Sequence, residues 1–356
     1  MPKIAINISP IFDGNSIRGV GYYTTNLIDS LQKEIKSNKE YKGWSIKLIK
    51  KTTTTKTGKY DLVHYPFFDP FNLTLSLDRY IPTVVTVHDL IPRQFKKHFP
   101  VGIKGTLKWF IQKNKLKKVA QIITVSNYSK KIINQIIKYP LKKISTTYLA
   151  ADASFKPITD TKKLEAVRQK YNLPSKFVLF IGDINWNKNI PNLVKACLDL
   201  DYPLVIVGSS ATKKNIPHHP WTKDIIWVQS QNHPNLIKTG FVPDEDLPLI
   251  YNLATIYCQP SFAEGFGLPL VQAMQSGCPV AYSQDSCLPE IMDKNGLKFD
   301  PWSIDSIKTT LKKYWDNPKI RQEFSQKGLK HAKMFNWSST ARATLAVYKL
   351  ALLNEK

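Results

Sequence analysis

Short apolar runs rich in β-branched residues alternate with amphipathic stretches along the whole chain. Such runs, apolar on both faces and separated by helical patterns, are typical of parallel sheets that helices cover on both sides. In the first half the pattern predicts strands at residues 3–8, 45–50, 62–65, 83–88, 121–125 and 144–149, with helices at 22–35 and 129–138.

The same alternation resumes in the second half after a charged, proline-bounded segment at residues 155–174. We interpret this segment, with one short helix at 161–171, as the linker between two domains. Beyond it the pattern predicts strands at 177–181, 203–207, 224–228, 256–259 and 279–282, and helices at 190–200, 247–253 and 269–276. A long helix is expected at 336–353, beginning near Asn336 or Ser338.

Two consecutive α/β halves predict two Rossmann-like, doubly wound domains facing a cleft. We place the first domain at residues 1–156 and the second at 157–335. Residues 336–356 are expected to form a C-terminal helix that crosses back to the first domain. Ligands in such folds bind beyond the carboxyl ends of the strands, so the cleft is the expected site.

Composition excludes several classes of protein. With 42% hydrophobic and 11% aromatic residues, the 356-residue chain can bury large cores and is not globally disordered. No apolar stretch approaches the roughly 20 residues of a membrane-spanning helix, and the N-terminus lacks the features of a signal peptide. The cysteines are scattered without a paired motif, which indicates a reducing cytosol rather than a disulfide framework or a zinc site; they are Cys197, Cys258, Cys278 and Cys287.

The chain carries 51 Lys+Arg and 27 Asp+Glu, a formal net charge of +24, and the excess is uneven. Residues 1–150 contain 26 basic and 8 acidic residues (+18), which leaves 25 and 19 (+6) for residues 151–356. A basic half indicates a polyanion, an anionic membrane surface or only a very soluble surface. Charge alone does not choose among the three.

Residues 260–274 are the most informative stretch for chemistry. They follow a predicted buried strand, and Gly265 and Gly267 permit a tight loop before a helix that begins around Pro269. The N-terminus of a helix favours anions, and Glu264 at the loop can accept hydrogen bonds from sugar hydroxyls. The alternative is an ordinary strand–loop–helix corner with a solvated Glu264.

This segment resembles the signature of two glutamates, eight residues apart, of the family four retaining glycosyltransferases, mannosyltransferase-like members among them, which have the GT-B fold. The resemblance implies that Glu264 contacts the donor sugar. It also implies that the loop backbone holds the sugar or diphosphate; these loop residues are Gly265, Phe266, Gly267 and Leu268. The second acidic position, which binds the ribose in the family, is Gln272 here. An amide can still hydrogen-bond a ribose hydroxyl, without the assistance of a charge.

A second segment, residues 180–192, resembles the family element in which a strand and a glycine precede Arg-Lys-Asn. Gly182 ends the strand, Lys188 matches the family lysine that faces the donor phosphates, and Asn187 takes the place of the arginine. Without the motif, Lys188 reads as one surface lysine among many. Gly208, after the next strand, is expected beneath the nucleotide base.

Three segments of the first half resemble family motifs as well. Residues 18–27 resemble the Gly-Ile-Gly-Arg-Tyr-Thr loop, which assigns Gly19, Gly21 and Tyr23 to an acceptor or phosphate loop. Residues 83–92 resemble the His-Asp-Leu-x-Pro motif, which places His88 near the reacting face of the sugar and Asp89 beside it. Ser126 either contacts the acceptor or caps the following helix.

The resemblance implies a retaining, metal-independent hexosyltransferase of polysaccharide biosynthesis that uses no cofactor. The sequence shows no set of His and carboxylate residues at the spacing of metal ligands. We expect a donor of the GDP-mannose or UDP-glucose type, GDP-mannose first, and a glycan or lipid-linked acceptor. Glu264, His88 and Lys188 are the expected catalytic residues. The alternatives are an epimerase, a phosphorylase, a catalytically weak sugar-nucleotide-binding protein or a nucleic-acid-binding protein.

The segment at 96–118 interleaves lysines with large apolar residues. It suits an anionic membrane surface, which predicts a cytoplasmic enzyme that binds peripherally to the inner face of the membrane. The alternative is a core-packed helix with a solvated lysine face. Nucleic acid is not the expected partner, because no nucleic-acid-binding motif accompanies the charge.

Overall fold

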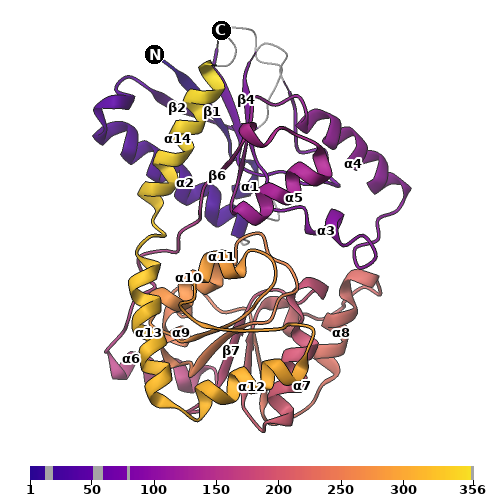
Figure 1. Ribbon diagram of the computed structural model, residues 1–356, viewed down its shortest axis with the longest axis vertical. Helices are drawn as coiled ribbons and strands as arrows, with labels where there is room; N and C mark the ends of the chain where they lie inside the picture. The colour runs from indigo at the N-terminus through magenta and orange to yellow at the C-terminus, as the bar shows by residue number, and fades with distance from the viewer. Residues whose placement is uncertain (13–18, 51–58, 78–80, 354–356) are drawn as a thin grey trace. The chain divides into compact units, whose positions relative to one another are not determined.

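The computed structural model describes residues 1–12, 19–50, 59–77 and 81–353 (Figure 1). The chain forms two compact units. The first contains Met1–Lys96, Val101–Ala150 and Phe335–Lys356. The second contains Ala151–Met334 together with the short segment Lys97–Pro100.

The first unit is built on a six-stranded parallel sheet with the order β2-β1-β3-β4-β5-β6. The strand order reverses between β1 and β3, which makes this the switch point of the sheet, the place where loops diverge to opposite sides. The strands are β1 (Lys3–Asn7), β2 (Ser45–Ile49), β3 (Leu62–Tyr65), β4 (Thr83–Thr86), β5 (Gln121–Thr124) and β6 (Ile144–Thr146).

Alternating side chains of these strands pack on helices at both faces. Val63, Val85 and Ile122 share a core with Trp109 of α4 (Ile103–Leu116) and Ile133 of α5 (Asn127–Ile137). The opposite face carries the C-terminal helix α14 (Trp337–Leu353), which contacts β3, β4 and β5 and packs along α2 (Gly19–Ser37) (Figure 1). The shorter helical segments are α1 (Ser9–Phe12), η1 (Lys39–Tyr41), α3 (Ile91–Gln94) and η2 (Leu141–Lys143).

The second unit has a six-stranded parallel sheet with the order β12-β11-β10-β7-β8-β9. This is the Rossmann order, and its switch point lies between β7 and β10. The strands are β7 (Val178–Ile181), β8 (Leu204–Val207), β9 (Leu236–Gly240), β10 (Ile256–Gln259), β11 (Val280–Ser283) and β12 (Leu297–Phe299).

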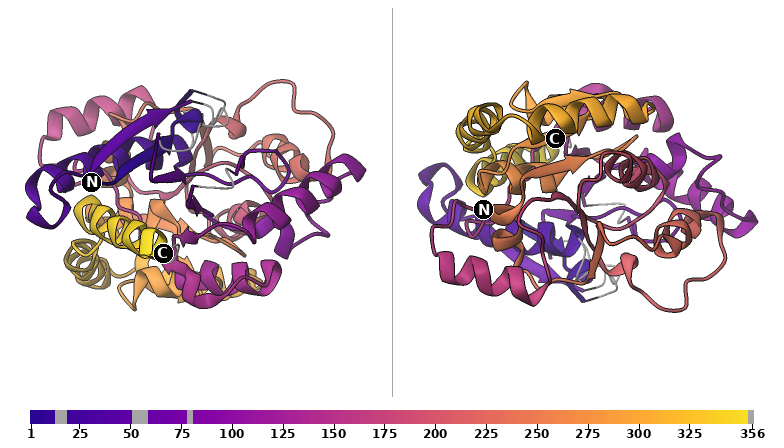
Figure 2. Two further views of the ribbon diagram at one scale, coloured as in Figure 1. Left: turned by 90° about the horizontal axis from the view of Figure 1, so that it is seen from above. Right: turned by 90° about the horizontal axis from the view of Figure 1, so that it is seen from below.

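Helices also cover both faces of the second sheet, as the views from above and below indicate (Figure 2). One core joins the sheet to α7 (Ile190–Asp199), α8 (Lys223–Ser230) and α12 (Ile304–Trp315). On the other face α10 (Leu268–Gln275) and α13 (Pro318–Ala332) contact β11 and each other. The remaining helical segments are α6 (Thr161–Lys170), η3 (Trp186–Lys188), η4 (Ser209–Ala211), η5 (Pro220–Thr222), α9 (Leu247–Leu253) and α11 (Leu288–Met292).

Two parallel, doubly wound sheets confirm the predicted fold class. The prediction of a strand at 224–228 is wrong, because these residues form most of α8. The strands of the second sheet that the pattern missed are β9 and β12. Predicted strand 83–88 ends at Thr86, so His88 and Asp89 lie in the loop that follows it.

Candidate functional site

The motif residues of the second unit gather at the switch point between β7 and β10. These two strands are hydrogen-bonded neighbours, and their chains continue to opposite sides of the sheet. The loop after β7 contains Lys188, and the loop after β10 contains Glu264. Topology therefore brings together two residues that are 76 positions apart in the sequence.

Glu264 is a buried carboxylate held by side chains of its own strand and loop. Its Oε1 accepts hydrogen bonds from Gln259 Nε2 at 2.8 Å and from Ser261 Oγ at 2.6 Å. Gln259 is fixed in turn by the hydroxyl of Tyr257, which donates to its Oε1, and all three supporting residues are buried. The carboxylate therefore has a set position at the carboxyl end of β10.

Lys188 supplies the positive charge beside this carboxylate. Its Nζ lies 2.7 Å from Oε1 and 2.9 Å from Oε2 of Glu264. The side chain of Lys188 is 21% exposed and that of Glu264 is 8% exposed, so the ion pair is largely shielded from water. Such a pair offers a carboxylate for hydroxyl groups and an ammonium for an anion within one small region.

Two asparagines tie the lysine loop to the glutamate loop. Asn187 is buried, and its side-chain Nδ2 donates to the backbone carbonyl of Ala263 at 2.8 Å. The backbone carbonyl of Asn187 accepts from the backbone amide of Phe262 at 2.8 Å. Asn189, at φ 55°, donates from Nδ2 to the carbonyls of Pro260 and Pro301. Asn187, predicted to contact the donor, thus occupies its side-chain amide in holding the two loops together.

The predicted donor loop leads directly into α10. Gly267 has φ +85° and precedes the helix, a conformation that favours glycine. A Cβ there would also lie 2.9 Å from Leu288 Cδ2, so the end of that side chain would have to shift. The amide of Glu264 donates to Ser286 Oγ at 3.2 Å, and Phe266 is buried. The loop from Glu264 to Leu268 therefore brings the N-terminus of α10 next to the ion pair.

Gln272, Gly182 and Gly208 also belong to this unit. Gln272 lies in the second turn of α10, where its Oε1 accepts a hydrogen bond from the hydroxyl of Tyr251 at 3.1 Å. Gly182 and Gly208 follow β7 and β8, and a Cβ on Gly208 would lie 2.3 Å from the carbonyl oxygen of Gly182. The two strand ends therefore approach each other more closely than any side chain would allow.

His88 and Tyr23 meet in the first unit. Their rings are perpendicular, with centroids 4.8 Å apart. His88 Nε2 lies 3.2 Å from the carbonyl oxygen of Pro66, and since a carbonyl only accepts, this nitrogen carries the proton. Burial lowers the pKa of His88 to about 4, so the ring is neutral at pH 7 with Nδ1 as an acceptor.

A buried network that the sequence did not reveal lies beneath these two residues. Thr86 Oγ1 is 3.2 Å from the hydroxyl of Tyr23 and 2.9 Å from Nε2 of His64. His64 Nδ1 is 2.7 Å from the hydroxyl of Tyr348 on α14. Burial lowers the pKa of His64 to about 3. In the sequence, the sign of this network is a histidine in an otherwise apolar predicted strand, and such a histidine does not indicate which partners it has.

The other predicted residues of the first unit have local roles. Gly19 and Gly21 lie in the first turn of α2 rather than in a loop before it, and residue 18 of that motif is outside the described residues. Asp89 Oδ1 accepts from the amide of Ile91 at 3.0 Å. Ser126 caps α5 by accepting from the amide of Ser129 at 3.0 Å, which is the capping role considered from sequence.

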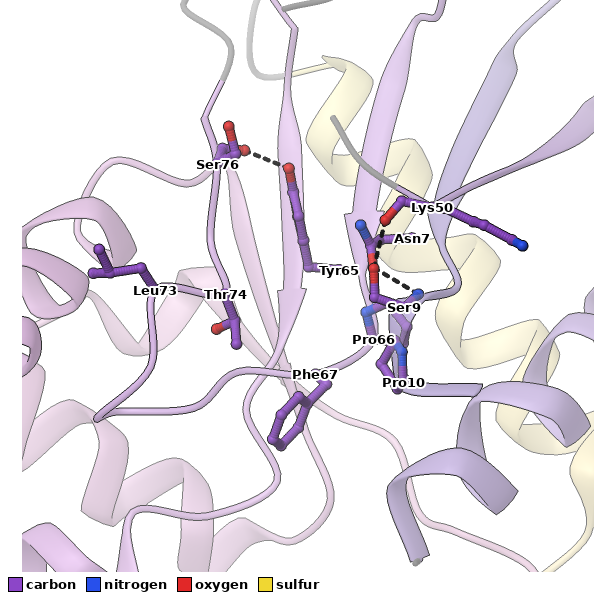
Figure 3. Close-up of a pocket in the computed structure, with 10 residues that line it drawn as sticks. All are labelled: Asn7, Ser9, Pro10, Lys50, Tyr65, Pro66, Phe67, Leu73, Thr74 and Ser76. Carbon is purple, nitrogen blue, oxygen red and sulfur yellow. Dashed lines mark hydrogen bonds between the residues drawn. The ribbon is translucent and has the colours of Figure 1, made fainter. Parts of the chain in front are cut away.

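A pocket of about 290 Å³ opens at the switch point of the first sheet (Figure 3). Residues that follow β1, β2 and β3 line it, among them Ser9, Lys50 and Phe67. Asn7, at the end of β1, accepts a hydrogen bond from the amide of Ser9 at 3.0 Å. The pocket combines hydroxyl, amide and ammonium groups with two aromatic rings, those of Tyr65 and Phe67, a mixture that suits a polar ligand with an apolar face.

Sequence reasoning singled out Glu264 and Lys188, which the structure joins in an ion pair, but it missed the residues that support the carboxylate. Tyr257, Gln259 and Ser261 are polar residues within or just after a strand that is otherwise apolar. Buried polar groups in such a place need partners, which is a signal for a network around Glu264.

Within the described parts of the chain, no three His, Cys, Asp or Glu residues are grouped as metal ligands would be. No described helix has the length and apolar character to cross a bilayer.

Both halves of the chain match models of known protein families. Residues 163–331 match the model of the glycosyl transferases group 1, and residues 33–155 match that of glycosyltransferase family 4. The O-antigen chain mannosyltransferase B of Escherichia coli is 32% identical to this chain over 301 residues, which cover 82% of this chain and 75% of the E. coli protein.

Solved structures share the fold across nearly the whole chain. Sucrose-phosphate synthase from Thermosynechococcus elongatus aligns with a TM-score of 0.72 at 17% identity and covers 98% of each chain. Anabaena HepE, in complex with UDP-glucose, aligns with a TM-score of 0.71 at 14% identity and covers 97% of this chain and 100% of that one. At these identities the likeness establishes the fold, which is GT-B.

Proposed function

This chain belongs to the group 1 glycosyltransferases, and on that basis we propose that it moves a hexose, with retention of configuration, from a nucleotide diphosphate sugar to a glycan or lipid-linked acceptor. The observation that carries the proposal is the Glu264–Lys188 pair at the switch point of the second sheet. Its carboxylate suits the hydroxyls of a sugar, and its ammonium suits the diphosphate.

The leaving diphosphate is the group whose charge must be stabilised. When the bond from sugar C1 to the phosphate oxygen breaks, negative charge grows on that oxygen, and Lys188 together with the N-terminus of α10 opposes it. The acceptor hydroxyl forms the new bond to C1 on the same face, and its proton passes to the departing phosphate oxygen. These groups need no metal ion, so transfer should persist in EDTA.

The remaining site residues take supporting roles in the proposal. Gln272 contacts the ribose through its side-chain amide, and Gly208, which follows β8, lies beneath the base. Neutral His88 offers Nδ1 as an acceptor to a sugar hydroxyl. The pocket in Figure 3 is our candidate for the acceptor, because its hydroxyl and ammonium groups match a glycan.

GDP-mannose is the first donor to test, because the E. coli relative is a mannosyltransferase. UDP-glucose is the second, since HepE holds it in the solved complex. The test mixes the protein with each donor and a mannan acceptor and follows the anomeric signals by NMR. We expect an α-linked product from an α-linked donor. A β-linked product would contradict retention, and donor binding without any transfer would favour a binding protein.

Helix α4 is our candidate for contact with an anionic membrane. Trp109 and Leu116 pack into the core, but Ile103, Leu107 and Phe110 are 91%, 60% and 63% exposed. Their spacing places them on one side of the helix, which also carries the exposed Lys104 and the half-buried Lys108, Lys113 and Lys115. No Asp or Glu occurs between Asp89 and Asp152. An apolar face with a basic surround suits anionic lipid headgroups.

Flotation with vesicles tests this contact. Wild type should float with vesicles that contain phosphatidylglycerol and less with neutral ones, because lysines add to the apolar insertion. The double variant Leu107→Glu/Phe110→Glu should lose flotation, and Leu141→Glu, at another exposed leucine of the same unit, should keep it. Equal recovery with both vesicle types would remove the membrane from the proposal.

A further inference from the structure

A second hollow of the second unit lies outside the Glu264–Lys188 site. It has a volume of about 510 Å³, within the range of small-molecule sites. We call it the indole groove. Its indoles and ammonium groups are those of Trp186, Trp221, Trp227, Lys97, Lys195 and Lys223.

Packed aromatic partners fix the orientation of these indoles. The ring of His98 is stacked on Trp186 with centroids 3.6 Å apart and an interplanar angle of 9°, and Phe262 stacks on Trp186 at 5.1 Å. Phe99 is buried and meets Trp221 edge-on at 5.2 Å. Lys195 Nζ lies 5.6 Å from the ring centroid of Trp227. The groove is therefore preformed, with three half-buried indoles around one hollow.

The charge of the groove favours an anion. Lys97, Lys195 and Lys223 are exposed and face a single carboxylate, that of Asp224. Burial raises the pKa of Asp224, while the charges of Lys223 and His98 lower it. Three exposed ammonium groups around apolar rings match a ligand that has apolar faces and negative substituents.

The groove is connected to the Glu264–Lys188 site through Trp186. Trp186 begins η3, and Lys188 ends the same short helix. Phe262, which stacks on Trp186, lies two residues before Glu264 and also stacks with Trp302 at 4.0 Å. A ligand in the groove would therefore lie against the loop after β7, which contains Lys188.

We propose that the indole groove binds an acidic oligosaccharide, a stretch of the glycan that the enzyme extends, away from the reacting end. This inference rests on the proposed function. The C–H faces of the sugar rings would pack on the indoles, and phosphate or carboxylate substituents would pair with the lysines. The proposed function favours a glycan here; single-stranded nucleic acid, whose bases also stack on aromatic rings, is the outcome that the DNA probe below tests.

Tryptophan fluorescence tests the groove without any transfer reaction. The probes are a phosphomannan oligosaccharide, the same oligosaccharide after removal of its phosphates, and a short single-stranded DNA. Wild type should bind the phosphorylated probe most tightly, and its affinity should fall as salt is added. The double variant Lys195→Gln/Lys223→Gln should bind this probe about tenfold more weakly and leave the neutral probe unchanged.

Matched variants separate the contributions of charge and stacking. Lys162→Gln/Lys319→Gln removes two exposed lysines that do not line the groove, and it should bind like wild type. Trp221→Ala should weaken both oligosaccharides. Equal affinity of wild type and the groove-lysine variant, or tighter binding of the DNA in competition, would overturn the proposal.

Donor binding is measured on the same proteins by titration with GDP-mannose and UDP-glucose. The groove variants should bind donor as wild type does. If no donor binds but the acidic oligosaccharide does, the proposed function fails while the groove survives. If donor binds and the oligosaccharide does not, the groove fails alone.

Discussion

At the scale of single residues, the site depends on an ion pair whose members come from different loops. Glu264 and Lys188 could be identified from sequence because each lies in a short motif after a predicted strand. The support from Tyr257, Gln259 and Ser261 could not, since it depends on which strand side chains point toward the carboxylate. The role of Asn187 was also missed, because the motif concerns a ligand and the contact is with Ala263.

Replacing Lys188 should show how much the Glu264–Lys188 ion pair contributes to the free energy of unfolding. Lys188→Met leaves a largely buried carboxylate without its cation and should lower the free energy of unfolding by about 2–3 kcal/mol. Glu264→Gln should cost less, because the amide that replaces the carboxylate retains polar atoms for Ser261 and Gln259. Urea unfolding of both variants and the double variant measures the coupling. Additive losses in the double variant would show that the pair contributes nothing as a pair.

The two neutral histidines of the first unit should make stability depend on pH. Their pKa values are lowered by burial from 6.5 to about 4 for His88 and about 3 for His64. Below about pH 6.5 the unfolded chain takes up protons that the folded chain does not. The free energy of unfolding should therefore fall as pH drops from 6.5 to 5, by up to about 1.4 kcal/mol per pH unit for each histidine.

Denaturant titrations of His64→Gln at several pH values measure how much His64 contributes to the pH dependence of the free energy of unfolding. The variant should lose less stability than wild type between pH 6.5 and 5, whatever its stability at pH 7. An identical pH slope in both proteins would mean that His64 is protonated equally in the folded and unfolded chains.

At the scale of elements, the errors of the sequence analysis come from residues with conflicting preferences. The run at 225–228 is apolar and short, which suits a buried strand, but it begins after η5 and becomes part of the eight-residue helix α8. Strand β9 takes the edge of the sheet instead. Its sequence, LIKTG, contains Lys238 and Thr239, so no apolar pattern marked it. The edge position of β9 explains its mixed polar and apolar sequence, because an edge strand is paired with a neighbour on only one side.

Two serine caps provide a matched test of local stability. Ser126 caps α5 and Ser303 caps α12, each by accepting from the amide three residues later. Ser126→Ala and Ser303→Ala should each lower the free energy of unfolding of their own unit by about 1 kcal/mol. Thermal and urea unfolding measure both.

Acceptor kinetics separate a cap from a binding residue. If Ser126 acts only as a cap, both variants should leave the KM for the glycan acceptor unchanged. A raised KM in Ser126→Ala and not in Ser303→Ala would show that Ser126 contacts the acceptor as well.

At the scale of the whole chain, alternating strands and helices were enough to predict two doubly wound sheets. Buried parallel strands have continuous apolar runs, and these survive in the sequence as a readable signal. The sequence did not predict that Lys97–Pro100 belongs to the second unit. This placement depends on contacts with residues far away in the sequence: His98 stacks on Trp186, and Phe99 meets Trp221. The uneven charge of +18 and +6 was readable, and it concerns partners rather than the reaction.

The most direct test of the proposed activity is the initial rate of hexose transfer by Glu264→Gln, measured with the donor that wild type uses. The control is Glu245→Gln, the same change at an exposed glutamate of the same unit. Circular dichroism and unfolding curves establish that both variants are folded. We predict that Glu264→Gln lowers kcat by about 100-fold or more and that Glu245→Gln retains the wild-type rate. A folded Glu264→Gln variant with undiminished transfer would contradict the assignment of this site.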